Sequence, residues 1–567
     1  MKTLDRHLWQ RFLSIATPYW RLEEKWKARG LLTLLVALLL AQTQFAVLLN
    51  EKTGEFTSAL AAHDEERFWT AIKLSLALLV AAVPVYAFYF YVRDKLGIHW
   101  RRWLTNRFLN SYFSKRHFYE LNSNTTIDNP DQRIAEDINT FTMRSLYFLL
   151  IFIGSILQLV AFSSVLWSIS TGLVYFLAAY AVAGTLITVF IFGKPLIGLN
   201  FQQLRREADF RFSLVRVREN AESIAFYRGE AQESLTVKRR FTEAFNNFNR
   251  IIRQQLFLNL FQYTYSMLTI VLPSAIIASK VLSGELEVGS AVQAAGAFAA
   301  VLTATSVIID NFENLSRFAA GVDRLNTFSK AMVAHPTSRA LNRDVIESVE
   351  NSSLALEDVT LQTPNYERIL VKNLSLTVKP GDSLMIVGTS GSGKSSLLRA
   401  IAGLWRSGSG KIIRPGPEEL LFLPQQPYML LGTLRSQLLY PNKEIPIPDA
   451  ELLRLLERVN LPDLAERFGG LDVEMDWEKV LSVGEQQRLA FARVLLTKPR
   501  YAILDEATSA LDIPNEELLY RELETIKTTL VSVGHRSTIV KFHKQILELT
   551  GNGEWQSHTA EDYDASL

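Results

Sequence analysis

The sequence predicts a multidomain membrane protein in which an all-α transmembrane domain of six helices precedes an α/β domain of the P-loop type. Three observations support this fold class. Long apolar blocks crowd the first 310 residues of the 567-residue chain. Short strand-like runs alternate with helical stretches after residue 353. The third observation is the stretch from Gly388 to Ser395, which reads G-x-x-x-x-G-K-S.

Composition narrows the function classes only slightly. The formal net charge of +2 gives no reason to expect a nucleic-acid partner. The absence of cysteine excludes disulfides and thiol catalysis. A cleavable signal peptide is not expected, because residues 1–29 are rich in charge and no small-residue cleavage site follows an early apolar core.

Residues 1–27 are predicted to form an amphipathic elbow helix. Apolar side chains such as Trp9 and Phe12 alternate there with Arg6, Arg11 and Arg21, a pattern typical of a helix that lies along a membrane surface. A plain soluble helix fits the same pattern. The apolar run that follows favours the membrane interpretation.

Six apolar runs in residues 28–330 predict the transmembrane domain. Each is long enough, at 1.5 Å per residue, to cross the ~30 Å hydrocarbon core of a bilayer. The predicted spans are residues 28–50, 71–92, 146–167, 172–193, 256–282 and 288–309. The second and fourth spans are followed by long polar segments, so helices are expected to continue into the cytoplasm.

Charge in the connecting segments predicts the orientation. The loop after the first span is acidic, whereas residues 93–144 carry many arginines and lysines. The basic side faces the cytoplasm by the positive-inside rule. Both chain termini are therefore expected to be cytoplasmic.

Several glutamines interrupt the apolar spans. They either line a translocation pathway or form hydrogen bonds between helices, and the second interpretation is the commoner one for any single residue. The residues are Gln42, Gln44, Gln158, Gln262 and Gln293.

Residues 331–352 are predicted to be a linker, because the chain becomes polar and carries Pro336 and scattered charges. Residues 353–567 are then expected to form the α/β domain, with a largely parallel sheet.

The P-loop stretch predicts a phosphate-binding site. It follows an apolar strand and precedes a helix, so its amides and the helix N-terminus point at phosphate oxygens. Lys394 would neutralise charge and Ser395 would ligate Mg²⁺. The predicted ATP-binding residues of this stretch are Gly388, Thr389, Ser390, Gly391, Ser392, Gly393, Lys394, Ser395 and Ser396.

A second apolar strand ends in Asp505 and Glu506. Beside a P-loop, Asp505 is placed to support Mg²⁺ and Glu506 to orient or deprotonate the attacking water. Two acids after a strand are otherwise more often a helix N-cap. The P-loop favours the catalytic interpretation.

Three further motifs complete the predicted site. Gln425 follows a strand and is expected to reach Mg²⁺ or water, and His535 follows another strand and is expected to contact a γ-phosphate. Ser482 and Gly484 stand at a predicted helix start, which makes a second anion-binding cradle. Together with Asp512, these elements occur in the order P-loop, glutamine, L-S-x-G-E, acidic strand, S-A-L-D, histidine.

With these motifs the chain resembles the ATP-binding cassette (ABC) transporters along nearly its whole length. The resemblance implies a type IV exporter-like half-transporter, which works as a homodimer because Ser482 and Gly484 of one copy meet the ATP held by the P-loop of the other. The motifs from Asn129 to Asp137 and from Glu222 to Gly229, with Gly403 to Trp405, resemble subfamily D and its SbmA/BacA-like and YddA-type bacterial relatives. The resemblance places coupling helices in the first two of these segments; solvated helical turns are the alternative.

The chain departs from the family pattern at two places. Val483 replaces one glycine of the usual pair, which affects one backbone contact only. Thr363 stands where many cassettes stack an aromatic ring on adenine, so Tyr366 is the expected substitute.

The expected function is ATP-hydrolysing transport of a peptide, acyl or other hydrophobic or amphipathic substrate across the bacterial inner membrane, with ATP and Mg²⁺ as cofactors. The alternative is an ATP-gated channel or a membrane-bound regulatory module. Intact Glu506 and His535 argue for hydrolysis. The direction of transport stays open.

Overall fold

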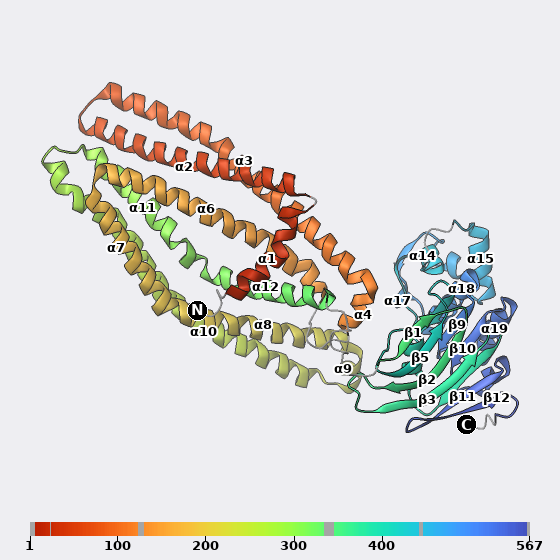
Figure 1. Cartoon of the computed structure of the whole chain (residues 1–567). Coiled ribbons are helices and arrows are strands. Elements are labelled where there is room, and N and C mark those ends of the chain that lie inside the picture. The colour runs from red at the N-terminus through yellow and green to blue at the C-terminus, as the bar shows by residue number, and fades with distance from the viewer. Residues whose placement is uncertain (1–5, 23, 123–129, 334–344, 442–445, 564–567) are drawn as a thin grey trace. The chain divides into compact units, whose positions relative to one another are not determined.

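The chain divides into two compact units, Met1–His335 and Pro336–Leu567, each with its own hydrophobic core. The computed structural model describes residues 6–22, 24–122, 130–333, 345–441 and 446–563 (Figure 1).

The first unit is helical throughout its described residues (Figure 1). Its elements are α1 (Arg6–Arg21), α2 (Lys25–Ala61), α3 (Glu65–Phe113), η1 (Ser114–Arg116), α4 (His117–Asn122), α5 (Pro130–Gln132), the π-helix η2 (Arg133–Asp137), α6 (Ile138–Ile169), α7 (Thr171–Ile187), the π-helix η3 (Thr188–Gly193), α8 (Lys194–Glu219), α9 (Ala221–Tyr227), α10 (Glu230–Leu282), α11 (Val288–Asp310) and α12 (Phe312–Val333).

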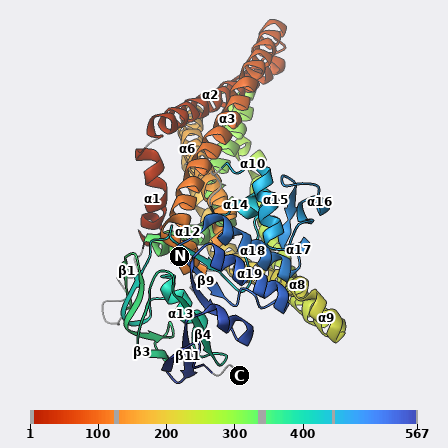
Figure 2. The same cartoon turned by 90° about the vertical axis from the view of Figure 1, so that its right-hand side faces the viewer.

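Six helical segments of this unit are long and apolar enough to cross a membrane. Each predicted span lies inside one of them: α2, α3, α6, α7 with η3, α10 and α11. The six-helix transmembrane region is therefore confirmed. The polar continuations are helical as well, since α8 and α10 run side by side up to the short helix α9 (Figures 1 and 2).

Helix α1 packs on its own unit through one face. Ile15, Ala16 and Tyr19 are buried, and the Tyr19 ring stacks on Trp100 of α3 with centroids 5.6 Å apart. Trp9, at 57% exposure, stays on the outside. The amphipathic pattern thus serves packing against protein as well as any contact with a membrane surface.

The motif that begins at Asn129 contributes to packing inside the unit. Asn129 itself lies outside the described residues. Arg133 is buried and donates a hydrogen bond of 2.6 Å to the carbonyl of Arg324 in α12. Asp137 forms an ion pair with the Arg324 side chain at 3.1 Å. These contacts join α12 to the start of α6.

The second unit is an α/β domain. Its strands are β1 (Glu347–Glu350), β2 (Leu354–Gln362), β3 (Ile369–Val378), β4 (Ser383–Gly388), β5 (Gly408–Arg414), β6 (Leu420–Leu423), β7 (Leu431–Thr433), β8 (Glu474–Asp476), β9 (Tyr501–Asp505), β10 (Thr529–Val533), β11 (Gln545–Gly551) and β12 (Glu554–Thr559). Its helices are α13 (Lys394–Ile401), α14 (Leu434–Leu439), α15 (Asp449–Arg458), α16 (Leu464–Arg467), α17 (Trp477–Val480), α18 (Val483–Thr497), α19 (Ile513–Thr525) and η5 (Ser537–Phe542).

The main sheet has the order β12-β11-β4-β10-β9-β6, and all its strands except β12 run parallel. Val533 of β10 pairs with both Ile386 of β4 and Asp505 of β9. The carboxyl ends of these strands therefore meet at one edge, which is where open parallel sheets bind ligands.

A smaller sheet, β1-β5-β2-β3, completes the second unit. Its strand β1 falls within the range predicted as linker, residues 331–352, and pairs with β5. Three of its four residues are exposed, so it lacks the apolar alternation by which a strand is found in a sequence. Residues 334–344 of the predicted linker lie outside the described residues.

Candidate functional site

The P-loop connects β4 to α13 and depends on its glycines. Gly388, Gly391 and Gly393 have φ angles of 143°, 79° and 103°, which side chains rarely allow. A Cβ on Gly388 would lie 2.3 Å from the carbonyl oxygen of Leu549 in the neighbouring strand β11. The loop can therefore curl back over the strand end only with glycine at this position.

The Lys394 ammonium lies inside the loop. Its Nζ donates hydrogen bonds to the carbonyl oxygens of Gly388 and Thr389, at 2.7 and 3.0 Å. The side chain is only 7% exposed. Burial lowers the pKa of Lys394 from its ordinary value, and the charges of Glu506 and Asp505 oppose this shift. The cation is thus held where a polyphosphate would lie.

Ser395 and Asp505 meet beside the loop. The Ser395 hydroxyl donates to the Asp505 carboxylate at 3.1 Å. Burial raises the pKa of Asp505, while the hydrogen bond from Ser395 works in the opposite direction. A hydroxyl and a carboxylate are ligands that Mg²⁺ prefers.

Glu506 is the point on which two other predicted residues converge. The Gln425 amide donates to one Glu506 carboxylate oxygen at 3.1 Å, and His535 Nε2 lies 3.3 Å from the other. Glu506 itself has a left-handed backbone, with φ 47°, and its amide bonds the carbonyl of Val533. Three strand ends thus bring these side chains together.

Ser482 begins helix α18 with a capping box. Its hydroxyl accepts from the Glu485 amide, and the Glu485 carboxylate accepts from the Ser482 amide at 2.8 Å. Burial would raise the pKa of Glu485, but hydrogen bonds from Arg467 and Ser482 lower it overall. Ser482 is exposed and Gly484 is partly exposed, so this helix start is open to a ligand.

The remaining two predicted residues lie in local structures of their own. Asp512 is the N-cap of α19 and accepts from the Asn515 amide at 3.1 Å. Tyr366 has φ 63° in the turn between β2 and β3, and the next residues of β3 include Leu370, whose side chain lies against Gly393 of the P-loop.

Gln487 connects the motifs and was missed as a site residue. Its amide donates to the carbonyl of Gln425 at 2.9 Å and accepts from the Ala510 amide at 3.1 Å. The only signal in the sequence is its place two residues after the L-S-x-G-E segment, because both contacts are with residues far along the chain.

A second missed group anchors the histidine segment. Glu516 is 1% exposed and accepts hydrogen bonds from the hydroxyls of Thr508 and Thr538. Arg536, next to His535, donates to the Leu511 carbonyl at 2.7 Å. These contacts fix the loops after β9 and β10 to each other.

The residues present fit ATP. Ser392 Oγ is buried without a hydrogen bond to any described residue, Lys394 supplies a cation, and α13 opens its N-terminus at the loop. Among the described residues, no group of three His, Cys, Asp or Glu side chains could hold a metal ion alone. Ser395 and Asp505 instead suit a cation that is also held by phosphate oxygens and water.

Known proteins match both units. The family model described as ABC transporter transmembrane region 2 matches residues 17–282, and the model described as ABC transporter matches residues 371–509. An uncharacterized ABC transporter ATP-binding protein of Synechocystis is 49% identical over 94% of this chain and 82% of its own length. The chloroplastic ABC transporter D family member 2 of Arabidopsis thaliana is 40% identical, over 96% of this chain and 86% of its own.

A solved structure shares the fold. A bacterial Atm1-family ABC exporter with ATP bound superimposes with a TM-score of 0.76, covering 94% of this chain and 96% of the exporter chain at 19% identity. These matches confirm the predicted family resemblance and the fold class, a helical transmembrane region with an α/β nucleotide-binding domain.

Proposed function

The chain belongs to the ABC transporter family and is an ATPase coupled to transport. We propose that two copies form a homodimer that moves a peptide, acyl or other amphipathic substrate across the bacterial inner membrane. The observation that carries the ATPase part is the convergence of Gln425 and His535 on Glu506 at the carboxyl edge of the sheet. A binding module without hydrolysis has no need of that arrangement.

Each site residue has a proposed role. Lys394 and the loop amides hold the phosphates. Ser395 and Gln425 would hold Mg²⁺, with Asp505 behind, and the bound cation would neutralise charge on the phosphates. Glu506 orients the attacking water and accepts its proton. His535 contacts the γ-phosphate and, with Gln425, keeps the Glu506 carboxylate in place.

The dimer is proposed because the site is incomplete in one copy. Ser482 and Gly484 form an exposed helix start that is ready for an anion. In the family that the chain belongs to, this helix start meets ATP bound to the other copy. Asp512 and Tyr366 are proposed to complete the ATP site at the dimer contact and at the adenine.

We propose that helix α9 transmits the motion of the two copies to the membrane spans. Phe226 and Tyr227 are neighbours on this helix and are 79% and 87% exposed, and adjoining exposed apolar side chains mark interaction sites. We infer that α9 docks on an ATP-binding domain, so that closure of the dimer switches the spans between two states of access. The many arginines and lysines in residues 93–144 support a cytoplasmic position for α9 and for both chain termini.

Uphill transport in sealed vesicles tests the proposal. Proteoliposomes of both orientations, inverted and right-side-out, are given ATP and Mg²⁺ on the side that bears the ATP-binding domains. Labelled peptides and acyl compounds are then added outside the vesicles. Accumulation above the outside concentration is expected for one orientation. The Glu506→Gln protein should bind ATP but accumulate nothing. Equilibration without accumulation would instead identify an ATP-gated channel, the alternative function.

A further inference from the structure

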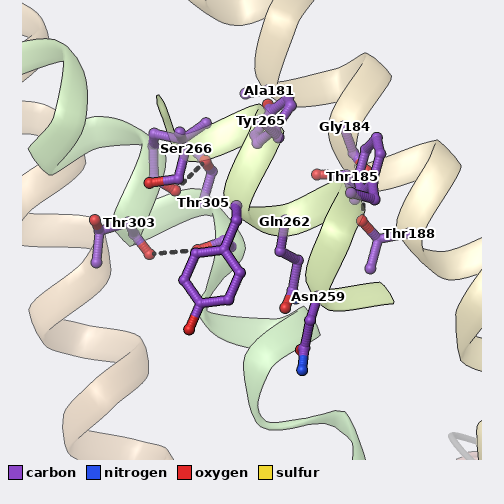
Figure 3. A pocket seen from close by; sticks show the side chains of 14 residues that line it. Ala181, Gly184, Thr185, Thr188, Asn259, Gln262, Tyr265, Ser266, Thr303 and Thr305 are labelled. Atoms are coloured by element: carbon purple, nitrogen blue, oxygen red, sulfur yellow. Dashed lines mark hydrogen bonds between the residues drawn. The ribbon is translucent and has the colours of Figure 1, made fainter. Parts of the chain in front are cut away.

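A cavity of about 350 Å³ lies within the transmembrane unit, between α7 with η3, α10 and α11 (Figure 3). Hydroxyl and amide side chains line it from all three helices. Figure 3 shows Gln262 of α10 between Thr185 and Thr188 on one side and Thr303 and Thr305 on the other. Its volume suits one small molecule.

The helices around the cavity carry no charge at its level. Helix α10 has no ionisable Asp, Glu, Lys or Arg between Arg253 and Lys280, and the same holds for residues 171–193 and 288–309. A charged ligand would therefore enter the membrane interior without a counter-charge from these helices. That transfer is costly, so the lining selects against net charge.

Five polar side chains at the cavity have no hydrogen bond to any described residue: the amides of Asn259 and Gln262 and the hydroxyls of Thr185, Tyr263 and Ser266. The neighbouring hydroxyls of Thr188, Thr303 and Thr305 bond carbonyls of their own helices instead. Polar groups inside a membrane span face a partner, water or a ligand. Asn259 and Gln262 are the two amides in this set, and each offers two N–H donors and a carbonyl acceptor.

One wall of the cavity is held rigid by a pair of tyrosines. Tyr180 and Tyr265 each donate to the other's carbonyl, at 2.7 and 2.8 Å, and their rings stack with centroids 4.2 Å apart. Gly184 permits this packing, since a Cβ there would lie 2.4 Å from the Tyr265 ring. Because the Tyr265 hydroxyl is already bonded, this wall offers ring surface rather than a free donor.

We propose that this cavity binds the transported substrate, and that the substrate there is a small neutral molecule combining amide or hydroxyl groups with an apolar part. Gln262 and Asn259 bind its polar groups, and the aromatic wall with Phe261 packs against its apolar part. The proposal rests on the proposed function for the word transported. Binding to the cavity itself does not depend on ATP hydrolysis.

Equilibrium dialysis of the full-length protein in nanodiscs, without nucleotide, tests the charge rule. The probes are three radiolabelled capped dipeptides of matched size: N-acetyl-Phe-Gln-amide, N-acetyl-Phe-Glu-amide and N-acetyl-Phe-Lys-amide. The neutral probe should bind at least about tenfold more tightly than either charged one, a difference of ~1.4 kcal/mol. Equal binding of all three, or binding of none, overturns the proposal.

The Gln262→Glu variant places the test on one residue. It should reverse the ranking in favour of the lysine probe, because it puts a carboxylate into the cavity. The matched control is Gln158→Glu, the same exchange on α6 outside the cavity lining, and it should keep the original ranking. A reversal in both variants, or in neither, would contradict the assignment. If the probes bind as expected but no ATP-driven accumulation occurs, the proposed function fails while the cavity assignment stands.

Discussion

At the scale of single residues, Gln487 shows how one amide can tie a site together. It is 1% exposed, and it uses both ends of its side chain, the donor on the Gln425 carbonyl and the acceptor on the Ala510 amide. Since Gln425 in turn donates to Glu506, the position of the proposed base depends on a side chain that does not reach it.

Replacing Gln487 with leucine should slow hydrolysis more than it weakens ATP binding. The exchange keeps a similar volume but leaves the Gln425 carbonyl and the Ala510 amide unpaired, so Gln425 and Glu506 lose their fixed position. We expect kcat to fall about tenfold, or ~1.4 kcal/mol, with KM for ATP little changed. Steady-state ATPase measurements in nanodiscs check this, and an unchanged kcat would show that Gln487 is dispensable.

Gly184 offers a test of the transmembrane packing. A methyl group there would force Tyr265 away from Tyr180, so Gly184→Ala should destabilise the unit by about 1–3 kcal/mol, as overpacked cores do. Gly198→Ala is the matched control, because a Cβ at that helical position meets nothing within 4 Å. Thermal unfolding in nanodiscs should show a lower Tm for the first variant only.

The sequence predicted residues that carry their chemistry in a motif and missed those whose partners are remote. Lys394, Ser395, Glu506 and His535 stand in segments whose strand, loop and helix order is readable along the chain. Tyr180 and Tyr265 are 85 positions apart, and no local sequence pattern predicts their contact. The sequence allows two interpretations of the glutamines in the spans, and only the cavity distinguishes Gln262.

At the scale of elements, the start of α18 combines a structural and a functional demand on one side chain. Ser482 caps the helix through its reciprocal bonds with Glu485. It is also the residue proposed to meet a phosphate. A substitution therefore mixes a loss of stability with a loss of activity unless the two are measured apart.

Ser482→Ala and Thr433→Ala separate these effects. Both remove an N-cap in the same unit, since Thr433 accepts from the Ser436 amide at the start of α14. Each should cost about 1 kcal/mol of stability, measured by denaturant unfolding. Only Ser482→Ala should also depress ATPase activity well below that of the equally destabilised Thr433→Ala protein. Equal activities would assign Ser482 a purely structural role.

Elements with strong periodicity were predictable, and elements defined by neighbours were not. The six spans are long, predominantly apolar runs, and each lies in one long helical segment. The exposed edge strand β1 carries no such pattern. The packing of Tyr19 in α1 on Trp100 could not be predicted from the sequence either. An amphipathic helix can bury its apolar face in protein or in lipid with the same spacing of apolar residues.

At the scale of the whole molecule, the proposed dimer requires ATP sites that a single chain cannot form. The P-loop with Glu506, and the exposed start of α18, lie in one unit, yet the proposal assigns them to two different ATP sites. A dimer then contains two sites, each built from both copies. Nanodiscs that hold a single copy should accordingly bind ATP but hydrolyse almost none.

Mixed dimers test this directly. One copy carries Lys394→Ala, which removes the P-loop cation, and the other carries Ser482→Arg, which blocks the start of α18; each variant alone should form dimers without an intact site. In a mixed dimer, purified through two different affinity tags, the intact P-loop of the second copy faces the intact Ser482 of the first. One of the two sites is thereby restored, so ATPase activity should return, to about half the wild-type rate if the sites act independently. If each site were built within one chain, mixing would restore nothing, because every copy would keep its own defect.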